Sequence, residues 1–171
     1  MNKASIKNIF FFCLCLLSIG LYAQNDTIVN PAAVVFPEPT GYITDTEDIF
    51  TEAEEATLTA IIEDFTVTGK GQIAVLTIAS IKPYDDFYRY ALDLSNHWGV
   101  GHKGKDDGVT IVISAALRQI RINTGNGTQK ILSDSFCNNV LQNKMIPNFK
   151  NMDYYQGVKE GLESLITEWK Q

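Results

Sequence analysis

The first apolar pattern downstream of the N-terminal region repeats at helical spacing after Thr51. Thr51 and Glu54 have the spacing of a capping box, in which each side chain accepts a hydrogen bond from the backbone of the other. The apolar residues that follow on one face are Leu58, Ile61, Ile62 and Phe65. Gly69 supplies a stop signal. The pattern therefore predicts a helix between Thr51 and Gly69.

The next two patterns predict a buried strand and a second helix. Residues 72–79 are apolar on both faces of a strand, as in a central strand that is covered on both sides. Pro83 suits the first turn of a helix, and Gly99 ends it. The apolar stripe of this helix is formed by Phe87, Tyr90, Ala91, Leu94 and Trp98.

The second half of the chain predicts a hairpin followed by two helices. Residues 109–113 are almost uniformly apolar and residues 119–123 alternate, as expected for a buried strand and the outer strand of a hairpin. Residues 133–145 predict a third helix, which Pro147 interrupts. Asp153 has a glutamine three residues later, and this capping-box spacing opens a final helix. Its apolar positions are Val158, Leu162, Leu165, Ile166 and Trp169.

This order of helices and strands predicts a three-layer α/β/α sandwich, with a small mixed central sheet and helices on both faces. The predicted domain covers residues 41–171. Residues 24–40 contain three prolines among polar residues and are expected to form an extended leader, in which residues 32–36 could add an edge strand.

The N-terminus has the order of charge, apolar run and small residue that is typical of a secretory signal peptide. Lys3 and Lys7 precede the apolar residues 9–17, and the run gives way to Ala23, after which we expect cleavage. A membrane anchor is the alternative, but the run is shorter than the ~20 apolar residues that cross a bilayer. Residues 1–23 are therefore predicted to be a signal peptide, and the product is expected to be periplasmic or secreted.

Charge and cysteine content narrow the function classes for the mature chain. Residues 24–171 carry 12 basic and 20 acidic residues, a formal charge of −8. This acidic balance argues against binding to nucleic acid or anionic lipid and is compatible with cation binding. Only Cys137 remains after removal of the signal peptide, so no internal disulfide can form. No later stretch reaches membrane-spanning length, so we expect no transmembrane segment in the mature chain.

Four aspartates precede predicted strands or helices, where ligands gather in open α/β sheets. Asp106 and Asp107 lie in the loop before a buried strand, and Asp45 and Asp134 lie just before helices. If these segments meet, the carboxylates could bind a hard cation, with Gln129 adding a neutral oxygen. Calcium, rather than magnesium, is the expected ion. The alternative is that Asp45 and Asp134 cap helices while Asp106 is a solvated loop charge.

Other motifs point to structure rather than to chemistry. Residues 99–104 fit a dinucleotide-binding pattern, but they follow a helix and precede a strand, the reverse of the order that such a site requires. His97 and His102 lack the further ligands that zinc needs, and Cys137 is expected to be a buried apolar residue. Four tyrosines outside the helical stripes could form a partner surface or an amphipathic shoulder. These are Tyr84, Tyr88, Tyr154 and Tyr155.

Several short motifs resemble the TPM domain family, which is named from a thylakoid lumen protein and its relatives. The most specific is the block of residues 96–109, which contains Asn-His-Trp-Gly-Val-Gly and, later, Asp-Asp-Gly. The resemblance runs from Tyr42 to Trp169 and so covers nearly all of the mature chain. Its other segments are residues 43–45, 68–75, 121–127, 132–134 and 146–154.

The resemblance implies an α/β/α sandwich outside the cytoplasm, calcium binding in some members, and upkeep of membrane complexes such as photosystem II. It also implies an acid phosphatase activity, which is reported for plant members. The family usually has a tyrosine at the position of Asn126 and a glutamate near Gln129, so one carboxylate of a family site would be missing here. Many bacterial relatives also carry a membrane anchor and a glycine-rich tail after the domain, whereas this chain stops at Gln171.

Three functional hypotheses follow from these patterns. The first is an exported, non-catalytic TPM-type module that binds calcium and assists or docks onto envelope or membrane proteins. The second is a metal-dependent acid phosphatase that acts on phosphate monoesters, in which the cation would polarise a phosphoryl oxygen. No catalytic residue can be assigned for that reaction. The third is a structural, partner-binding domain without a metal.

Overall fold

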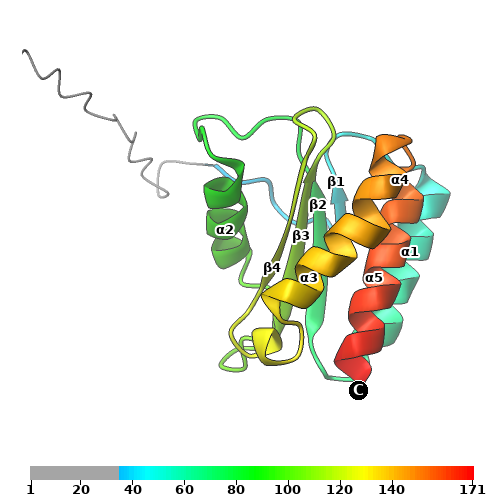
Figure 1. Ribbon diagram of the computed structural model, residues 1–171. Coiled ribbons are helices and arrows are strands. Elements are labelled where there is room, and N and C mark those ends of the chain that lie inside the picture. Colours follow the sequence, from blue (N-terminus) through cyan, green and yellow to red (C-terminus); the bar gives the residue numbers. More distant parts are fainter. Residues whose placement is uncertain (1–34) are drawn as a thin grey trace, which may run out of the picture.

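The computed structural model describes residues 35–171 and contains a four-stranded sheet with helices on both faces (Figure 1). The predicted signal peptide and residues 24–34 of the leader lie outside the described residues. The strands are β1 (Ile43–Asp45), β2 (Gln72–Thr77), β3 (Gly108–Ser114) and β4 (Gln119–Thr124). The α-helices are α1 (Glu52–Thr66), α2 (Phe87–Trp98), α3 (Asp134–Val140), α4 (Ile146–Lys150) and α5 (Tyr154–Lys170). A 3-10 turn, η2 (Thr128–Lys130), and a π-helical turn, η3 (Leu141–Met145), complete the order.

The sheet has the strand order β1-β2-β3-β4. β1, β2 and β3 run parallel, and β4 pairs with β3 as the antiparallel strand of a hairpin. α1, α3 and α5 pack on one face and α2 packs on the other. The predicted mixed sheet and three-layer sandwich are confirmed. Because α1 and α2 connect successive neighbouring strands from opposite faces, the two crossovers have opposite hands, although nearly all such connections are right-handed.

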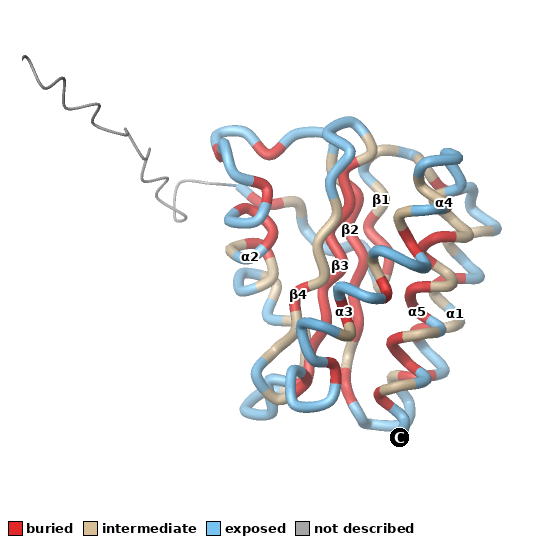
Figure 2. The backbone as a smooth tube through the Cα atoms, viewed as in Figure 1, coloured by how far each residue is buried: buried red, intermediate tan, exposed pale blue. Residues whose placement is uncertain are grey.

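The two faces of the sheet carry separate cores. Ile73 and Val75 of β2 point into the larger core, beneath α1, α3 and α5, and Leu76 points into the smaller core beneath α2. Figure 2 shows β2 and β3 buried along most of their length, whereas β4 is mostly half-buried. The prediction of two central strands is confirmed, although β2 ends at Thr77, two residues before the predicted end.

Local capping explains where α1 begins. The Thr51 amide donates to Oε2 of Glu54 at 2.7 Å, and the Glu54 amide donates to the Thr51 hydroxyl oxygen at 3.3 Å. Both halves of the predicted capping box are therefore present. The helix then buries Leu58, Ile62 and Phe65 on one face.

α2 begins at Phe87, four residues later than the predicted start at Pro83. The Asp86 carboxylate accepts a hydrogen bond from the Tyr88 amide at 2.8 Å, and this cap fixes the start. Pro83 instead lies in the preceding loop, after a cis peptide bond. Gly99 ends the helix with φ of 61°, as the sequence predicts.

The third predicted helix continues past its expected end. α3 passes directly into the π-helical turn η3 and then into α4, so the helical segment runs on to Lys150. Pro147 lies within it, and the prediction that Pro147 interrupts the helix is wrong. At the start of α5, the Asp153 carboxylate accepts from the Gln156 amide at 3.0 Å. The Gln156 side chain turns away and donates to Glu160 at 2.8 Å, so only half of that predicted capping box forms.

The last part of the leader is attached to the domain. Phe36 is 4% exposed and packs against Tyr84, Tyr90 and His97. Residues 35–40 form no strand, so the described end of the proposed edge strand at residues 32–36 is not a strand. Tyr84, which the sequence leaves as a surface candidate, is buried. Burial, together with the hydrogen bond from its hydroxyl to Asp93, raises the pKa of Tyr84 to about 12.

Within residues 35–171, no helix combines the length and apolar character needed to cross a membrane.

Candidate functional site

The five residues that the sequence predicts as metal ligands lie at two opposite ends of the sheet. Asp45 is paired in register with Thr77, at the carboxyl end of β2. Asp107 precedes β3, whose first residue is paired with Gln72 at the amino end of β2. At about 3.3 Å per residue, β2 separates the two ends by more than ~15 Å. Asp45 therefore cannot share an ion with Asp107, and the expected convergence of all four aspartates is wrong.

Asp45 organises the turn that leads from β1 into α1. Its Oδ2 accepts a hydrogen bond from the Phe50 amide at 2.8 Å. Its Oδ1 accepts from the Glu47 amide at 3.3 Å and from the Thr77 hydroxyl. Both carboxylate oxygens are thus used within the fold. Asp45 does not cap α1, whose N-cap is Thr51, so the capping alternative is wrong for this residue.

Asp107 and His102 close the loop between α2 and β3. Asp107 is 8% exposed, and its Oδ1 accepts from the His102 amide at 2.6 Å. Its Oδ2 lies 2.9 Å from Nδ1 of the His102 ring. Burial acts to raise the pKa of the Asp107 carboxyl, but the two His102 contacts and the positive charges of His102 and Lys105 outweigh burial and lower the pKa. Asp107 is therefore held as a carboxylate that fixes the loop.

Two close backbone approaches hold this loop against the sheet. A Cβ on Gly108 would lie 1.8 Å from the Val100 carbonyl oxygen, and a Cβ on Gly125 would lie 2.1 Å from the Asp106 carbonyl oxygen. The Gly101 amide donates to Oε1 of Gln72 at 3.0 Å. The glycines of the dinucleotide pattern, Gly99, Gly101 and Gly104, all have positive φ, so the conformation of the loop accounts for them.

Asp106, Gln129 and Asp134 come from three segments at the amino end of β3. The Asp106 carbonyl oxygen accepts hydrogen bonds from the Gly127 amide at 3.0 Å and the Thr128 amide at 3.2 Å. Immediately afterwards, Nε2 of Gln129 donates to Oδ1 of Asp134 at 2.9 Å. All three side chains are exposed to solvent. The structure therefore places these three predicted residues at one end of the sheet, with a side-chain contact between Gln129 and Asp134, and leaves Asp45 at the other end.

A polar hollow of about 410 Å³ lies on the other side of the same loop, between the end of α2 and the end of β4. Its walls include Ser95 and Asn96 of α2, Lys103 and Asp106 of the loop, and Asn126. The buried Asn123 supports this wall, because its Nδ2 donates to the Ala91 carbonyl oxygen at 2.9 Å and to the Ser95 hydroxyl oxygen at 2.8 Å. Asp106 thus lines this hollow, whereas Gln129 and Asp134 do not.

A model of the TPM domain matches residues 43–168. The chain belongs to the TPM domain family. The N-terminal domain of a protein from P. gingivalis is similar, with 24% identity, a TM-score of 0.69, and coverage of 82% of this chain and 90% of that chain. The BA42 protein from the psychrophilic bacterium Bizionia argentinensis has 21% identity, a TM-score of 0.62, and coverage of 72% and 83%.

The N-terminal domain of the cg2496 protein from Corynebacterium glutamicum has 15% identity, a TM-score of 0.59, and coverage of 81% of this chain and 88% of that chain. Identities this low show only that the folds are shared and do not assign a function. No curated protein sequence matches the chain significantly.

The carboxylates of this TPM domain fit a cation only in part. Within residues 35–171, no group of three or more His, Cys, Asp or Glu side chains is arranged to hold a metal ion. Gln129 lies near the position at which the family resemblance implies a glutamate, and its side-chain amide already donates a hydrogen bond to Asp134. Asp106, Gln129 and Asp134 supply hard oxygens of the type that calcium prefers, but fewer than the six to eight that it takes. Water would have to complete the coordination.

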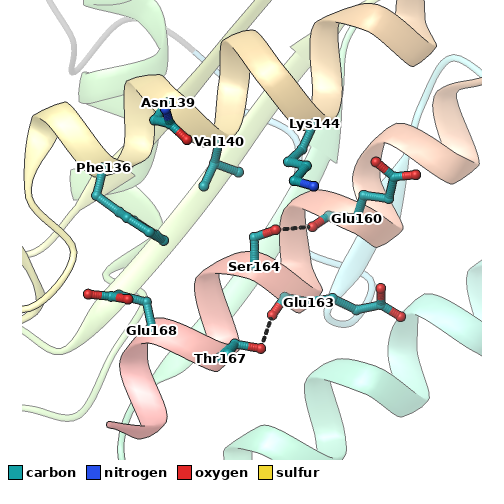
Figure 3. Close-up of a pocket in the computed structure, with 9 residues that line it drawn as sticks. All are labelled: Phe136, Asn139, Val140, Lys144, Glu160, Glu163, Ser164, Thr167 and Glu168. Carbon is teal, nitrogen blue, oxygen red and sulfur yellow. Dashed lines mark hydrogen bonds between the residues drawn. The ribbon is translucent and has the colours of Figure 1, made fainter.

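A second hollow of the TPM domain, also about 410 Å³, lies between α3 and α5 (Figure 3). Phe136 and Val140 form its apolar side, and Glu160, Glu163 and Lys144 line the rest. The hydroxyls of Ser164 and Thr167 donate back to the carbonyl oxygens of Glu160 and Glu163, at 2.7 and 2.6 Å. These hydroxyls are therefore engaged in α5 itself.

The remaining candidate residues of the TPM domain have structural roles. Cys137 is buried, and burial raises the pKa of its thiol to about 11, as expected for an unreactive side chain. Sequence reasoning missed the part played by His102, which it considered as a possible zinc ligand. The signal was available, because a histidine five residues before an aspartate in a glycine-rich loop can fold back onto that carboxylate.

Proposed function

We propose that this chain is a non-catalytic TPM module that binds calcium weakly at Asp106, Gln129 and Asp134 and docks onto envelope or membrane proteins. The observation that carries the proposal is the hydrogen bond from Gln129 to Asp134 at 2.9 Å, directly after the segment whose amides bind the Asp106 carbonyl oxygen. Gln129 and Asp134 thus meet at the amino end of β3, and the bonds to the Asp106 carbonyl oxygen hold the Asp106 segment beside them. The bound ion would join three segments that are separate in the sequence.

The chemistry of this edge favours weak binding. Two carboxylates and one carboxamide give a low ligand charge, and the remaining ligands must be water. Sites of this kind in extracellular modules bind calcium with Kd values of roughly 10⁻⁴–10⁻³ M. Such an affinity suits an ion that is abundant outside the cytoplasm, and it agrees with the expected export of the chain.

A non-catalytic role is favoured by the way the other carboxylates are used. Both oxygens of Asp107 accept hydrogen bonds from His102, and both oxygens of Asp45 accept hydrogen bonds from its own turn. A general base or a nucleophile needs a free lone pair directed at the substrate. The carboxylates held most firmly by the fold are therefore the ones least suited to reaction.

Calcium titration of the mature protein, followed by two-dimensional NMR, tests the proposal. We expect saturable shifts of the amides near Asp106, Gln129 and Asp134, and a melting temperature that rises with calcium. Asp106→Asn should abolish both effects. Asp48→Asn is the matched control, because Asp48 and Asp106 both have left-handed backbone, with φ of 53° and 52°, and asparagine tolerates that conformation equally well.

The position of Asp48 makes this control informative. It lies at the opposite end of the sheet, in an acidic group with Asp45 and Glu55. Burial, followed by the charges of Asp45, Asp48 and Glu52, raises the pKa of the Glu55 carboxyl. If Asp48→Asn removed the calcium response and Asp106→Asn did not, the ion would bind at that end and the assignment would be wrong.

The phosphatase alternative is tested on the same samples. Release of phosphate from p-nitrophenyl phosphate that requires a divalent cation and disappears in Asp106→Asn would contradict the non-catalytic role. Activity that survives the substitution would be a contaminant. Export is tested separately by N-terminal sequencing of the protein recovered from the periplasm or medium, where we expect the chain to begin at Gln24.

A further inference from the structure

The two edges of the sheet differ in how much backbone they leave open. β1 is three residues long, so the edge on that side is short. β4 is six residues long and pairs only with β3 in the sheet. Its register with β3 is continuous from Gln119 to Thr124, with no extra residue to form a bulge. β4 therefore offers a straight edge along its whole length.

The outward backbone groups of β4 can be assigned from the antiparallel pattern. The Gly125 amide donates to the Gly108 carbonyl oxygen at 2.9 Å, and paired residues alternate between facing the partner and facing away. Ile120, Ile122 and Thr124 therefore direct their N–H and C=O groups away from β3. Within residues 35–171, these groups make no backbone hydrogen bond with a segment outside the sheet.

Natural proteins protect an open edge of this kind with proline, inward-pointing charge, a bulge or short length. β4 has no proline and no bulge, and Arg121 is its one charged residue. A hollow of about 500 Å³ lies beside the start of β4. It is lined by Phe87, Tyr88, Arg118, Gln119, Ile120 and Ile146, together with Asp85 and Asp86. The edge thus runs past a preformed recess that side chains of an added strand could enter.

Arginine is unevenly placed in this acidic chain. It has three arginines, and two of them, Arg118 and Arg121, are at or next to β4. The third, Arg89, lies 2.9 Å from the Asp93 carboxylate. Neither Arg118 nor Arg121 forms an ion pair with a carboxylate in the described part of the chain. The Arg121 guanidinium instead donates a hydrogen bond from Nε to Oδ1 of Asn123 and lies 4.8 Å from the centre of the exposed Tyr88 ring.

We infer that the open edge of β4 binds an extended segment of another protein, which adds as a fifth strand and places an acidic side chain against Arg118 and Arg121. Backbone hydrogen bonds to Ile120, Ile122 and Thr124 supply the affinity, and alternate side chains supply the specificity. Apolar residues of the segment pack beside Ile120, Phe87 and Ile146. The inference rests on the docking part of the proposed function and identifies the surface that performs it.

A second copy of this chain is a poorer occupant than an acidic segment. Antiparallel pairing of two β4 edges about Ile122 would place the two copies of Arg121 on the same face, at diagonal positions. Like charges at such close positions oppose pairing. An acidic partner segment turns the same arginines into attractive contacts.

Hydrogen exchange on the mature protein, with a synthetic peptide as probe, tests the inference. The peptide is acetyl-Ser-Val-Glu-Val-Glu-Val-Ser-amide, and its counterpart has lysine in place of glutamate. Without peptide, the outward amides of Ile120, Ile122 and Thr124 should exchange fast and those of Arg121 and Asn123 slowly. The acidic peptide should slow the three outward amides at least ~tenfold, and the basic peptide should not.

Variants separate the backbone and charge contributions. Ile122→Pro removes an outward N–H without removing a bond to β3 and should abolish peptide binding. If that variant fails to fold, the double variant Arg118→Glu with Arg121→Glu still tests the inference. It should lower the affinity for the acidic peptide at least ~tenfold and raise the affinity for the basic peptide. Arg89→Glu is the matched control on α2 and should leave peptide binding unchanged.

Three outcomes would overturn the inference: no protection by the acidic peptide, equal protection by both peptides, or protection that appears without peptide as protein concentration rises. The last would assign the edge to a second copy. The calcium response is measured on the same samples. If it persists while peptide binding fails, only the docking surface is wrong; if it fails while protection persists, only the calcium site is wrong.

Discussion

The indole N–H of Trp98 donates a hydrogen bond to the carbonyl oxygen of Pro37 at 2.9 Å. This bond ties the last turn of α2 to the leader, and Phe36 is buried beside it. The leader therefore forms part of the smaller core, in which Phe36 packs against Tyr84 and against Tyr90 of α2. A domain boundary drawn at residue 41 would cut through this contact.

Replacement of Phe36 by alanine should destabilise the domain by about 3–5 kcal/mol, the range typical of a buried phenylalanine that is truncated to alanine. The ring is 4% exposed and packs against three aromatic side chains, so its removal would leave a cavity. Urea unfolding followed by tryptophan fluorescence measures the change. Val35→Ala is the neighbouring control, since Val35 is 95% exposed and should change stability by less than ~0.5 kcal/mol. Equal effects of the two variants would show that the leader does not contribute to the core.

The contact between Asp107 and His102 predicts a defined dependence of stability on pH. The pKa of the Asp107 carboxyl is lowered by folding, so its contribution is fully present above the unfolded pKa of ~3.9 and is lost as pH falls through the folded value. Wild type should therefore be more stable than Asp107→Asn at pH 6, and the difference should shrink below about pH 4. Urea unfolding at a series of pH values measures both proteins. A difference that stays constant from pH 6 to pH 3 would show that the Asp107 charge makes no contribution.

Local patterns in the sequence predicted the elements, whereas distances between elements depended on the strand order. The capping box at Thr51 could be read directly, because both partners lie within one turn. The position of Asp45 could not be predicted in this way, because it depends on how the three-residue strand β1 aligns with β2. The face occupied by α2 was equally hidden, since its crossover has the opposite hand from that of α1. A ligand set inferred from four loops therefore had no means of separating the two ends of the sheet.

The candidate site was predictable only where its residues are close in sequence. Gln129 and Asp134 lie five residues apart and form a hydrogen bond, whereas the approach of the Asp106 segment depends on the pairing of β3 with β4, which the hairpin pattern predicted. The role of Asp107 was missed because a buried aspartate and an exposed one look alike in sequence. Phe36 was missed as a core residue because the prolines around it indicated an extended leader.

Close packing between the α2–β3 loop and the sheet makes Gly108 sensitive to substitution. A Cβ there would lie 1.8 Å from the Val100 carbonyl oxygen, so the backbone of the loop must move. We expect Gly108→Ala to cost about 1–3 kcal/mol and to shift the NMR signal of the His102 amide. The contrast is Gly104→Ala, where no atom lies within 4 Å and only the φ of +81° is unfavourable. That variant should cost about 1–2 kcal/mol and leave the His102 signal in place. The reverse order of effects on His102 would contradict the packing argument.

Restoring a carboxylate at position 129 tests whether charge limits the affinity for calcium. In Gln129→Glu the hydrogen bond to Asp134 is replaced by repulsion between two carboxylates, so the calcium-free protein should lose stability. Calcium relieves that repulsion and gains a ligand, so we expect its affinity to rise ~tenfold, which corresponds to about 1.4 kcal/mol. Isothermal calorimetry and calcium-dependent melting measure the two effects. The double variant Gln129→Glu with Asp134→Asn keeps the wild-type number of carboxylates and should return the affinity to near the wild-type value. An affinity that does not change in Gln129→Glu would place the ion elsewhere on the chain, because a third carboxylate at its binding site must alter the binding free energy.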